Sequence, residues 1–196
     1  MVFNILNEIK KVSVFQGCDE AFISEVVENI RISQVPLGQT IVSRGDETKD
    51  VYINFDGLLD ITYLLEDGKK VTFDLITPYR LFGEISSIDG KSRSASISCF
   101  TKVNLGTINH KFFINKMLEN KDFLRGLLNR FSLTIRKNNQ QIVHLASADS
   151  RKKVIIQLLR LSRSADDQWY PQVVEGISHD ALASFIGLSR ETVTRV

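Results

Sequence analysis

The sequence predicts an α+β fold in three parts: a jelly-roll β-roll, a long helix and a C-terminal helix-turn-helix. Between about Ile32 and Ile108 the apolar residues follow a period of two and are separated by glycine-containing turns. Residues 120–147 carry a long helical apolar repeat without proline. The last stretch, 178–196, has the cap and turn residues of two short crossed helices.

The first part begins with helical sequence over residues 3–30. Gly17 is expected to break this segment, and Asp19 is expected to cap the helix that follows. Short strands then alternate with turns, and a hairpin is predicted at Glu66-Asp67-Gly68-Lys69. Regular short strands with glycine at the turns favour a sandwich or jelly-roll barrel, with the helices covering one of its faces.

Composition places the chain among ordinary soluble proteins. It has 196 residues, 43% of them hydrophobic and 24% charged, and a net charge of +2. The sequence contains no apolar run of the roughly 20 residues that a membrane span needs. Cys18 and Cys99 are far apart and have no nearby metal-ligand partners, which fits a reducing cytoplasm. We therefore expect a cytoplasmic protein that has no membrane partner.

The stretch Leu81–Ser98 carries the first functional signal. Gly83 permits a positive φ or a close backbone approach before a short helix that begins at Glu84. Arg93 offers a planar fork that matches phosphate oxygens, and Ser94 adds a hydroxyl donor. The Glu84 carboxylate is an acceptor and suits a sugar hydroxyl. These residue types predict a site for a small anionic ligand.

In order and spacing these residues resemble the phosphate-binding cassette of the cyclic-nucleotide-binding fold. The resemblance implies that Gly83, Arg93 and Ser94 hold a cyclic phosphate and that Glu84 accepts the ribose 2′-OH. An alternative stays open, in which the segment is a β-roll turn with a surface Arg–Glu pair and no ligand. The sequence departs from the family at Pro78-Tyr79-Arg80, where a Gly-Asp turn is usual.

The long helix contains a heptad seam that favours a parallel homodimer. Its apolar and polar seam positions are Leu128, Phe131, Ile135, Asn138, Ile142 and Leu145. Asn138 can set the register of such a dimer. By resemblance to the catabolite activator protein/FNR family, Asn138 and Asn139 also align with helix residues that read the nucleotide base. Both interpretations remain open here.

The C-terminal stretch is predicted to form a helix-turn-helix. Ser178 and Ser189 are candidate caps, and Gly187 makes the turn between the helices. Arg190, Glu191 and Arg195 lie on the second helix, where arginine can pair with guanine and glutamate with cytosine. Ser189 and Thr192 are placed for phosphate contacts. The alternative is a short helix with three solvated charges.

Leu-Ser-Arg-Glu-Thr-Val-Thr-Arg, ending at Arg195, closely resembles the recognition helix of the catabolite activator protein/FNR (Crp/Fnr) family of bacterial transcription regulators. The resemblance extends over essentially the whole chain. It implies that Arg190, Glu191 and Arg195 read half-sites of TGTGA type and that His179 touches the DNA backbone. The β-hairpin wing that usually follows is absent, because the sequence ends at Val196. The expected domains are a β-roll domain (1–119), a dimerisation helix (120–147) and a DNA-binding domain (148–196).

The leading hypothesis is a dimeric transcription regulator that binds a pseudo-palindromic DNA site under control of a small anionic effector. Cyclic AMP is the candidate effector, RNA polymerase is an expected partner, and no cofactor is required. An alternative is a family member with a non-nucleotide effector or none. Two cysteines cannot supply the four thiolates of an iron–sulfur cluster, and the histidines are poorly placed for haem. The sequence has no nucleophile elbow, P-loop or zinc signature, so an enzyme, or a regulatory module of one, is the less favoured hypothesis.

Overall fold

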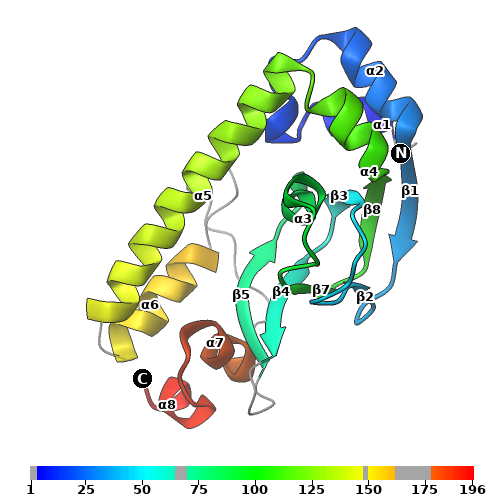
Figure 1. Ribbon diagram of the computed structural model, residues 1–196. Coiled ribbons are helices and arrows are strands. Elements are labelled where there is room, and N and C mark those ends of the chain that lie inside the picture. Colours follow the sequence, from blue (N-terminus) through cyan, green and yellow to red (C-terminus); the bar gives the residue numbers. More distant parts are fainter. Residues whose placement is uncertain (1–3, 65–69, 148–149, 162–177) are drawn as a thin grey trace. The chain divides into compact units, whose positions relative to one another are not determined.

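The computed structural model of the chain describes residues 4–64, 70–147, 150–161 and 178–196 (Figure 1). The hairpin predicted at residues 66–69 lies outside these ranges, as does the polar segment around Trp169 and Tyr170. The contacts divide the chain into two compact units. One comprises Met1–Ile61 and Leu75–Leu133, and the other comprises Thr62–Asp74 and Thr134–Val196. The predicted division at 119 and 147 remains a prediction.

The N-terminal segment forms three short helices. These are α1 (Ile5–Ile9), the 3₁₀ turn η1 (Ser13–Phe15) and α2 (Glu20–Asn29). Gly17 breaks the segment as predicted, with a φ of +92°. The Asp19 side chain caps α2 by accepting a hydrogen bond from the backbone N–H of Phe22 at 2.7 Å.

Within the described residues, eight strands form two four-stranded sheets, as the period-two pattern predicts. In the first sheet the order is β1-β8-β3-β6, and its strands are Ile30–Val35, Val103–Ile108, Val51–Asp56 and Arg80–Phe82. In the second sheet the order is β2-β7-β4-β5, and its strands are Thr40–Val42, Ser96–Cys99, Leu59–Leu64 and Lys70–Ile76. The β3–β6 register pairs Tyr52 with Phe82 and Asn54 with Arg80.

Two apolar clusters hold the first unit together. One lies between the sheets and contains Val42, Leu59 and Phe82 among others. The second joins the first sheet to the helices at one end of the roll, where Phe15 and Phe123 lie 5.2 Å apart between ring centroids. The predicted helical cover is therefore confirmed, because alternate side chains of β3 and β8 face it.

The helices that follow the cassette have well-defined ends. They are α3 (Glu84–Asp89), α4 (His110–Phe112), the π-helical turn η2 (Phe113–Met117) and α5 (Lys121–Ser147). The Asn120 carboxamide oxygen accepts hydrogen bonds from the N–H groups of Asp122 and Phe123, at 3.1 and 2.9 Å. Gly126 interrupts the apolar repeat because a Cβ atom there would lie 2.5 Å from the Val14 carbonyl oxygen.

The C-terminal helices are α6 (Ser150–Leu161), α7 (His179–Ile186) and α8 (Arg190–Arg195). Between α7 and α8 the chain turns at Gly187, with a φ of +66°. Leu182, Ala183, Ile186 and Val193 are buried between these helices, as the sequence predicts for a helix-turn-helix.

Candidate effector site and nucleic-acid interface

Gly83 stands at the junction between β6 and α3. Its φ of +81° is a left-handed conformation that glycine adopts without strain. A Cβ atom at this position would lie 2.9 Å from Nη1 of Arg93 and 3.2 Å from the carbonyl oxygen of Asp50. Glycine therefore provides both the turn and the space in which the Arg93 side chain lies.

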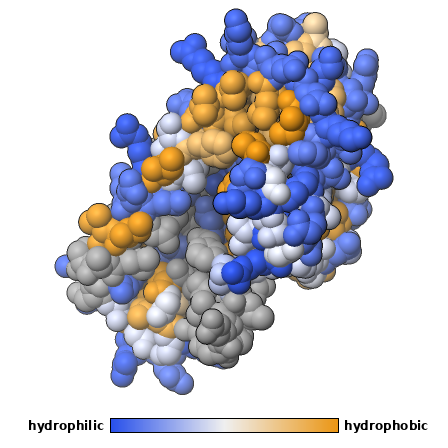
Figure 2. Space-filling model, in the orientation of Figure 1, coloured by the Kyte–Doolittle hydropathy of each residue, from blue (hydrophilic) through white to orange (hydrophobic). Residues whose placement is uncertain are grey.

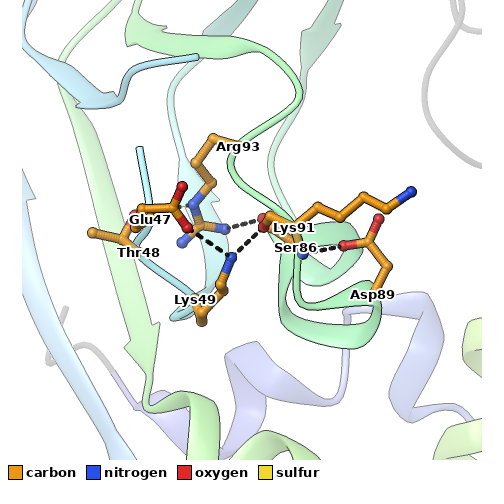
Figure 3. Close-up of polar contacts among 7 residues, drawn as sticks. All are labelled: Glu47, Thr48, Lys49, Ser86, Asp89, Lys91 and Arg93. Atoms are coloured by element: carbon orange, nitrogen blue, oxygen red, sulfur yellow. Dashed lines mark hydrogen bonds and ion pairs between the residues drawn. The ribbon is translucent and has the colours of Figure 1, made fainter. Parts of the chain in front are cut away.

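Arg93 is 3% exposed, so its guanidinium is held inside the protein (Figure 3). Nε donates to Thr48 Oγ1 at 3.1 Å, and Nη2 donates to the Asp50 carbonyl at 2.7 Å. Nη1 donates to the Gly83 carbonyl at 2.8 Å and to Ser86 Oγ at 3.0 Å. These four hydrogen bonds use most of the five N–H donors of an arginine. Arg93 thus joins the loop before β3 to the start of α3.

A second group of contacts closes the same loop around Arg93 (Figure 3). Lys49 donates to the backbone carbonyl of Lys91 and lies 3.7 Å from a Glu47 carboxylate oxygen. The N–H of Arg93 donates to the Asp46 carbonyl at 2.8 Å, and the N–H of Gly45 donates to the Arg93 carbonyl at 2.9 Å. The cassette arginine is therefore fixed by its backbone as well as by its side chain.

Ser86 and Ser87 connect α3 to two other elements. Ser86 accepts from Arg93, whereas the Ser87 hydroxyl lies 2.8 Å from Nδ1 of His110 at the start of α4. The N–H of His110 donates to an Asp50 carboxylate oxygen at 3.0 Å. Both serines are buried, so α3 is hydrogen-bonded on its inner face to α4 and to the Arg93 loop.

Glu84 is 5% exposed and does not contact Arg93. Its Oε1 lies 3.3 Å from Nη2 of Arg130, which comes from α5. Nη1 of Arg130 is buried and has no hydrogen-bond partner among the described residues. Burial lowers the pKa of Arg130, Glu84 opposes this shift, and Arg80 adds to it. The carboxylate predicted to take a sugar hydroxyl is thus paired with a buried cation in this structure.

The remaining predicted effector residues do not contact this network. Ser94 is exposed, and its hydroxyl has no hydrogen-bond partner in the part of the chain that the structure describes. Asn138 and Asn139 are exposed on the C-terminal half of α5, which belongs to the second unit. Their roles in ligand binding remain predictions.

In the helix-turn-helix, the predicted DNA-reading charges lie on the surface of α8. Arg190, Glu191 and Arg195 are all exposed. Arg190 Nη1 lies 3.3 Å from an Asp180 carboxylate oxygen of α7, where both side chains are solvated and the pair is easily exchanged. An exposed arginine of this kind can exchange the carboxylate for hydrogen bonds to the edge of a base.

The predicted phosphate-contacting residues are hydrogen-bonded to one another within the motif. Ser189 caps α8 by accepting from the N–H of Thr192 at 3.2 Å, and the two hydroxyls lie 2.9 Å apart. His179 Nδ1 lies 3.0 Å from Thr194 Oγ1, which joins the start of α7 to α8. The capping role predicted for Ser189 is confirmed, while contacts of Ser189, Thr192 and His179 with DNA remain predictions.

Two family models match the chain. The model described as the cyclic nucleotide-binding domain matches residues 32–120, which include the whole Arg93 cassette. The model described as bacterial regulatory proteins of the crp family matches residues 177–196, the helix-turn-helix. The fold and these matches define a sensor domain of cyclic-nucleotide-binding type combined with a DNA-binding motif.

Curated relatives and solved structures agree with this description. A CRP-like cAMP-activated global transcriptional regulator of Mycobacterium tuberculosis is 23% identical over 95% of this chain and 84% of its own length. A global nitrogen regulator of Synechococcus elongatus is 29% identical over 85% of this chain and 77% of its own. The c-di-GMP responsive global regulator CLP of Xanthomonas campestris has the same fold, with a TM-score of 0.75 at 19% identity over 90% and 89% of the two chains.

The chain belongs to the Crp/Fnr family of transcription regulators. It is a DNA-binding transcription regulator and not an enzyme. Within the described ranges, the structure contains no helix long and apolar enough to cross a membrane. The same ranges hold no group of three or more His, Cys, Asp or Glu side chains arranged to bind a metal ion.

Several residues that contact the site could not be predicted from the sequence. Arg130 follows Glu84 by 46 positions. It lies in the long helix that the heptad pattern predicts to dimerise, so no local motif links the two residues. The Ser87–His110 contact is similarly long-range, at 23 positions. Thr48 and Asp50 precede β3 in a loop without a recognisable pattern. Only the apolar surroundings of Arg130 in the helix offered a signal that this charge would be buried and need a partner.

Proposed function

We propose that this protein is a homodimeric regulator whose DNA binding is controlled by a small anionic effector that binds at the α3 cassette. The observation that carries the proposal is a pair of arginines beside α3, the buried Arg93 and the partly buried Arg130 of α5. Buried cations are costly unless they are paired, and Nη1 of Arg130 has no partner among the described residues. An anion that reaches this guanidinium would satisfy it.

A cyclic nucleotide is the first effector to test. The cassette residues Gly83, Glu84, Arg93 and Ser94 support it, and so do the cyclic nucleotide-binding domain match and the similarity to the cAMP-activated regulator of M. tuberculosis. Binding would require Arg93 to exchange some of its present acceptors for phosphate oxygens, since four hydrogen bonds already occupy it.

A non-nucleotide anion is the second candidate. The Glu84 carboxylate, which would accept the ribose hydroxyl, is already paired with Arg130. An effector without a sugar would leave this pair in place and use the remaining Arg130 donor. The exposed hydroxyl of Ser94 is available to either ligand.

Dimerisation is proposed through α5. Leu128, Ile135 and Ile142 recur at heptad spacing on this helix and are 56%, 59% and 65% exposed in the single chain. Figure 2 shows hydrophobic residues gathered over the N-terminal half of α5. Exposed apolar residues that recur on one helix face fit burial against a second copy. Two copies would present two α8 helices to successive major grooves, ~34 Å apart, on a pseudo-palindromic site.

Isothermal titration of the full chain with cAMP, and in parallel with cGMP, tests the effector. We expect micromolar binding that Arg93→Ala abolishes. The matched control is Arg31→Ala, since Arg31 is an exposed arginine on β1 of the same roll and its loss should leave the titration unchanged. Absence of heat with both nucleotides would reject the nucleotide, and titration with small dicarboxylates and Arg130→Ala would then follow.

The regulatory step is tested with the same ligand and a labelled TGTGA-type palindromic duplex in fluorescence anisotropy. An effector that controls DNA binding must bind one conformation of the dimer more tightly than another. Ligand that binds at Arg93 but leaves DNA affinity unchanged would contradict allosteric control while preserving the binding site.

A further inference from the structure

Tyr79 has an unusual backbone conformation. Its φ is +62°, and no other non-glycine residue in the described ranges has a positive φ. A side chain in the left-handed region is strained, because Cβ crowds the following carbonyl group. Such strain persists only where surrounding contacts hold it. The residue stands in the turn between β5 and β6, at the Pro78-Tyr79-Arg80 position where the sequence departs from the family.

Contacts from α1 and the turn that follows it hold the Tyr79 side chain. The phenol donates to Glu8 Oε2 at 2.8 Å, and Lys11 Nζ lies 3.3 Å from the phenol oxygen. Lys11 Nζ also lies 2.8 Å from Glu8 Oε1 and 5.0 Å from the centre of the Tyr79 ring. The three side chains form a closed group, hereafter the Tyr79 clamp. The clamp fixes the N-terminal helix to the turn before β6.

The backbone of Tyr79 is held from the opposite side. Its N–H donates to the Asn54 carbonyl at 2.7 Å, which places the turn against the end of β3. Asn54 is completely buried, and its Nδ2 donates to the carbonyls of Gly57 and Ile76, at 2.9 and 3.2 Å. Because β3 is fixed in this way, movement at Tyr79 must be taken up by β6.

Strand β6 leads directly from the clamp to the effector cassette. It has three residues, Arg80–Phe82, and Gly83 follows immediately. The Gly83 carbonyl accepts a hydrogen bond from Arg93, and Glu84 contacts Arg130. A change in the direction of the chain at Tyr79 therefore reaches the contacts of both Arg93 and Arg130 through a single short strand.

From these contacts we propose that Tyr79 is a positioning residue for effector binding, and that Glu8 of α1 and Lys11 just after it hold the cassette in its present arrangement. The inference rests on the proposed role of α3 as the effector site. Release of the clamp lets Tyr79 leave the strained conformation, and β6 and Gly83 then lose their fixed position. By linkage, an effector that favours one arrangement of the cassette also favours one state of the clamp.

Hydrogen exchange measured by mass spectrometry on the full chain without effector tests the clamp. Tyr79→Phe removes the phenol hydroxyl, and Glu8→Gln removes the charge that accepts from it. For each variant we expect amides in 80–84 to exchange roughly tenfold faster, the effect of losing one charge-assisted hydrogen bond on a local opening. The double variant should exchange about as fast as Glu8→Gln alone, because that variant already weakens both the Tyr79–Glu8 hydrogen bond and the Lys11–Glu8 ion pair.

Lys10→Gln is the matched control. Lys10 is the C-cap residue of α1, next to Lys11 in the sequence, and pairs with Glu20 of α2 at 2.6 Å. We expect this variant to leave exchange in 80–84 unchanged. Equal effects of Lys10→Gln and Glu8→Gln, or changes confined to α1, would overturn the proposal, because the clamp would then only attach the helix. Since no ligand is used, failure of nucleotides to bind does not affect this test.

Discussion

At the scale of single residues, Gly83 shows how the cassette depends on a missing side chain. The position combines a positive φ with close contact to Arg93 and Asp50. Gly90, at the other end of α3, has a φ of +72° but open space around it. The two glycines thus separate the cost of backbone strain from the cost of crowding.

We predict that Gly83→Ala destabilises the protein by about 2 kcal/mol or more, whereas Gly90→Ala costs about 1 kcal/mol. Both substitutions introduce strain at a positive φ, but only the first pushes Cβ against the Arg93 guanidinium. Urea unfolding of the two variants measures the difference. Equal losses of unfolding free energy would mean that Arg93 moves aside at no cost.

Cys18 supplies a second prediction at this scale. Burial raises the pKa of its thiol to about 11, and Asp122 and Asp19 add to the shift. At pH 8 only about one thiol in a thousand is then ionised, against about one in ten for a pKa of 9.0. We expect iodoacetamide to alkylate Cys18 about a hundredfold more slowly than a free thiol at pH 8, with a rate that rises until about pH 11.

Mass spectrometry after timed alkylation checks this rate. The urea-unfolded protein serves as the control and should react rapidly at both cysteines. Fast modification of Cys18 in the folded chain at pH 8 would contradict the high pKa.

At the scale of elements, the two halves of α5 differ in how far their apolar residues are buried. Near its N-terminus, Phe123 and Leu127 are buried against the roll, and Gly126 allows contact with Val14. Further along, the seam residues Ile135 and Ile142 are exposed. In the proposed dimer, packing within the chain ends and association begins where this change from buried to exposed apolar residues occurs.

We predict that Ile135→Lys weakens the dimer roughly a hundredfold. The change removes two apolar side chains per dimer from the seam, about 3 kcal/mol in all. Leu133→Lys is the control, because Leu133 is 62% exposed but lies off the heptad seam. Sedimentation equilibrium gives both dissociation constants. If the two substitutions weaken the dimer equally, the interface does not follow the heptad seam.

The elements also show where sequence reasoning succeeds. Local patterns predicted the features that depend on residues a few positions apart. These are the cassette turn at Gly83, the helix caps Asp19 and Ser189, and the glycine between α7 and α8. The Glu84–Arg130 pair and the Tyr79 conformation depend on contacts between distant segments. A tyrosine with a positive φ opposes the residue's own preference, so no propensity argument could have found it.

At the scale of the whole molecule, the chain carries the proposed effector cassette in its first unit and the helix-turn-helix in its second. Each part was predicted from its own motif. No sequence pattern describes how effector binding would change DNA binding. This coupling depends on the free-energy difference between two alternative arrangements of the proposed dimer.

We predict that Arg190→Ala lowers affinity for a TGTGA-type palindrome by about 1–3 kcal/mol by removing one bidentate pair with guanine, with a smaller loss on a random duplex. Anisotropy titrations on the two duplexes measure this. Arg151→Ala, at an exposed arginine of α6, is the charge control and should affect both duplexes equally. Equal losses from Arg190→Ala on both duplexes would exclude base reading.

The acceptors that surround Arg93 affect how readily unrelated phosphate compounds could bind to this arginine. An empty cassette with an open guanidinium would attract any small anion, including those present at millimolar concentration. Here an incoming anion must outcompete Gly83, Ser86, Thr48 and Asp50 for the same hydrogens. A small anion with a single negative group would gain little binding free energy from this exchange of hydrogen bonds. If Arg93 is the effector contact that we propose, its four hydrogen bonds set a threshold against weakly binding anions.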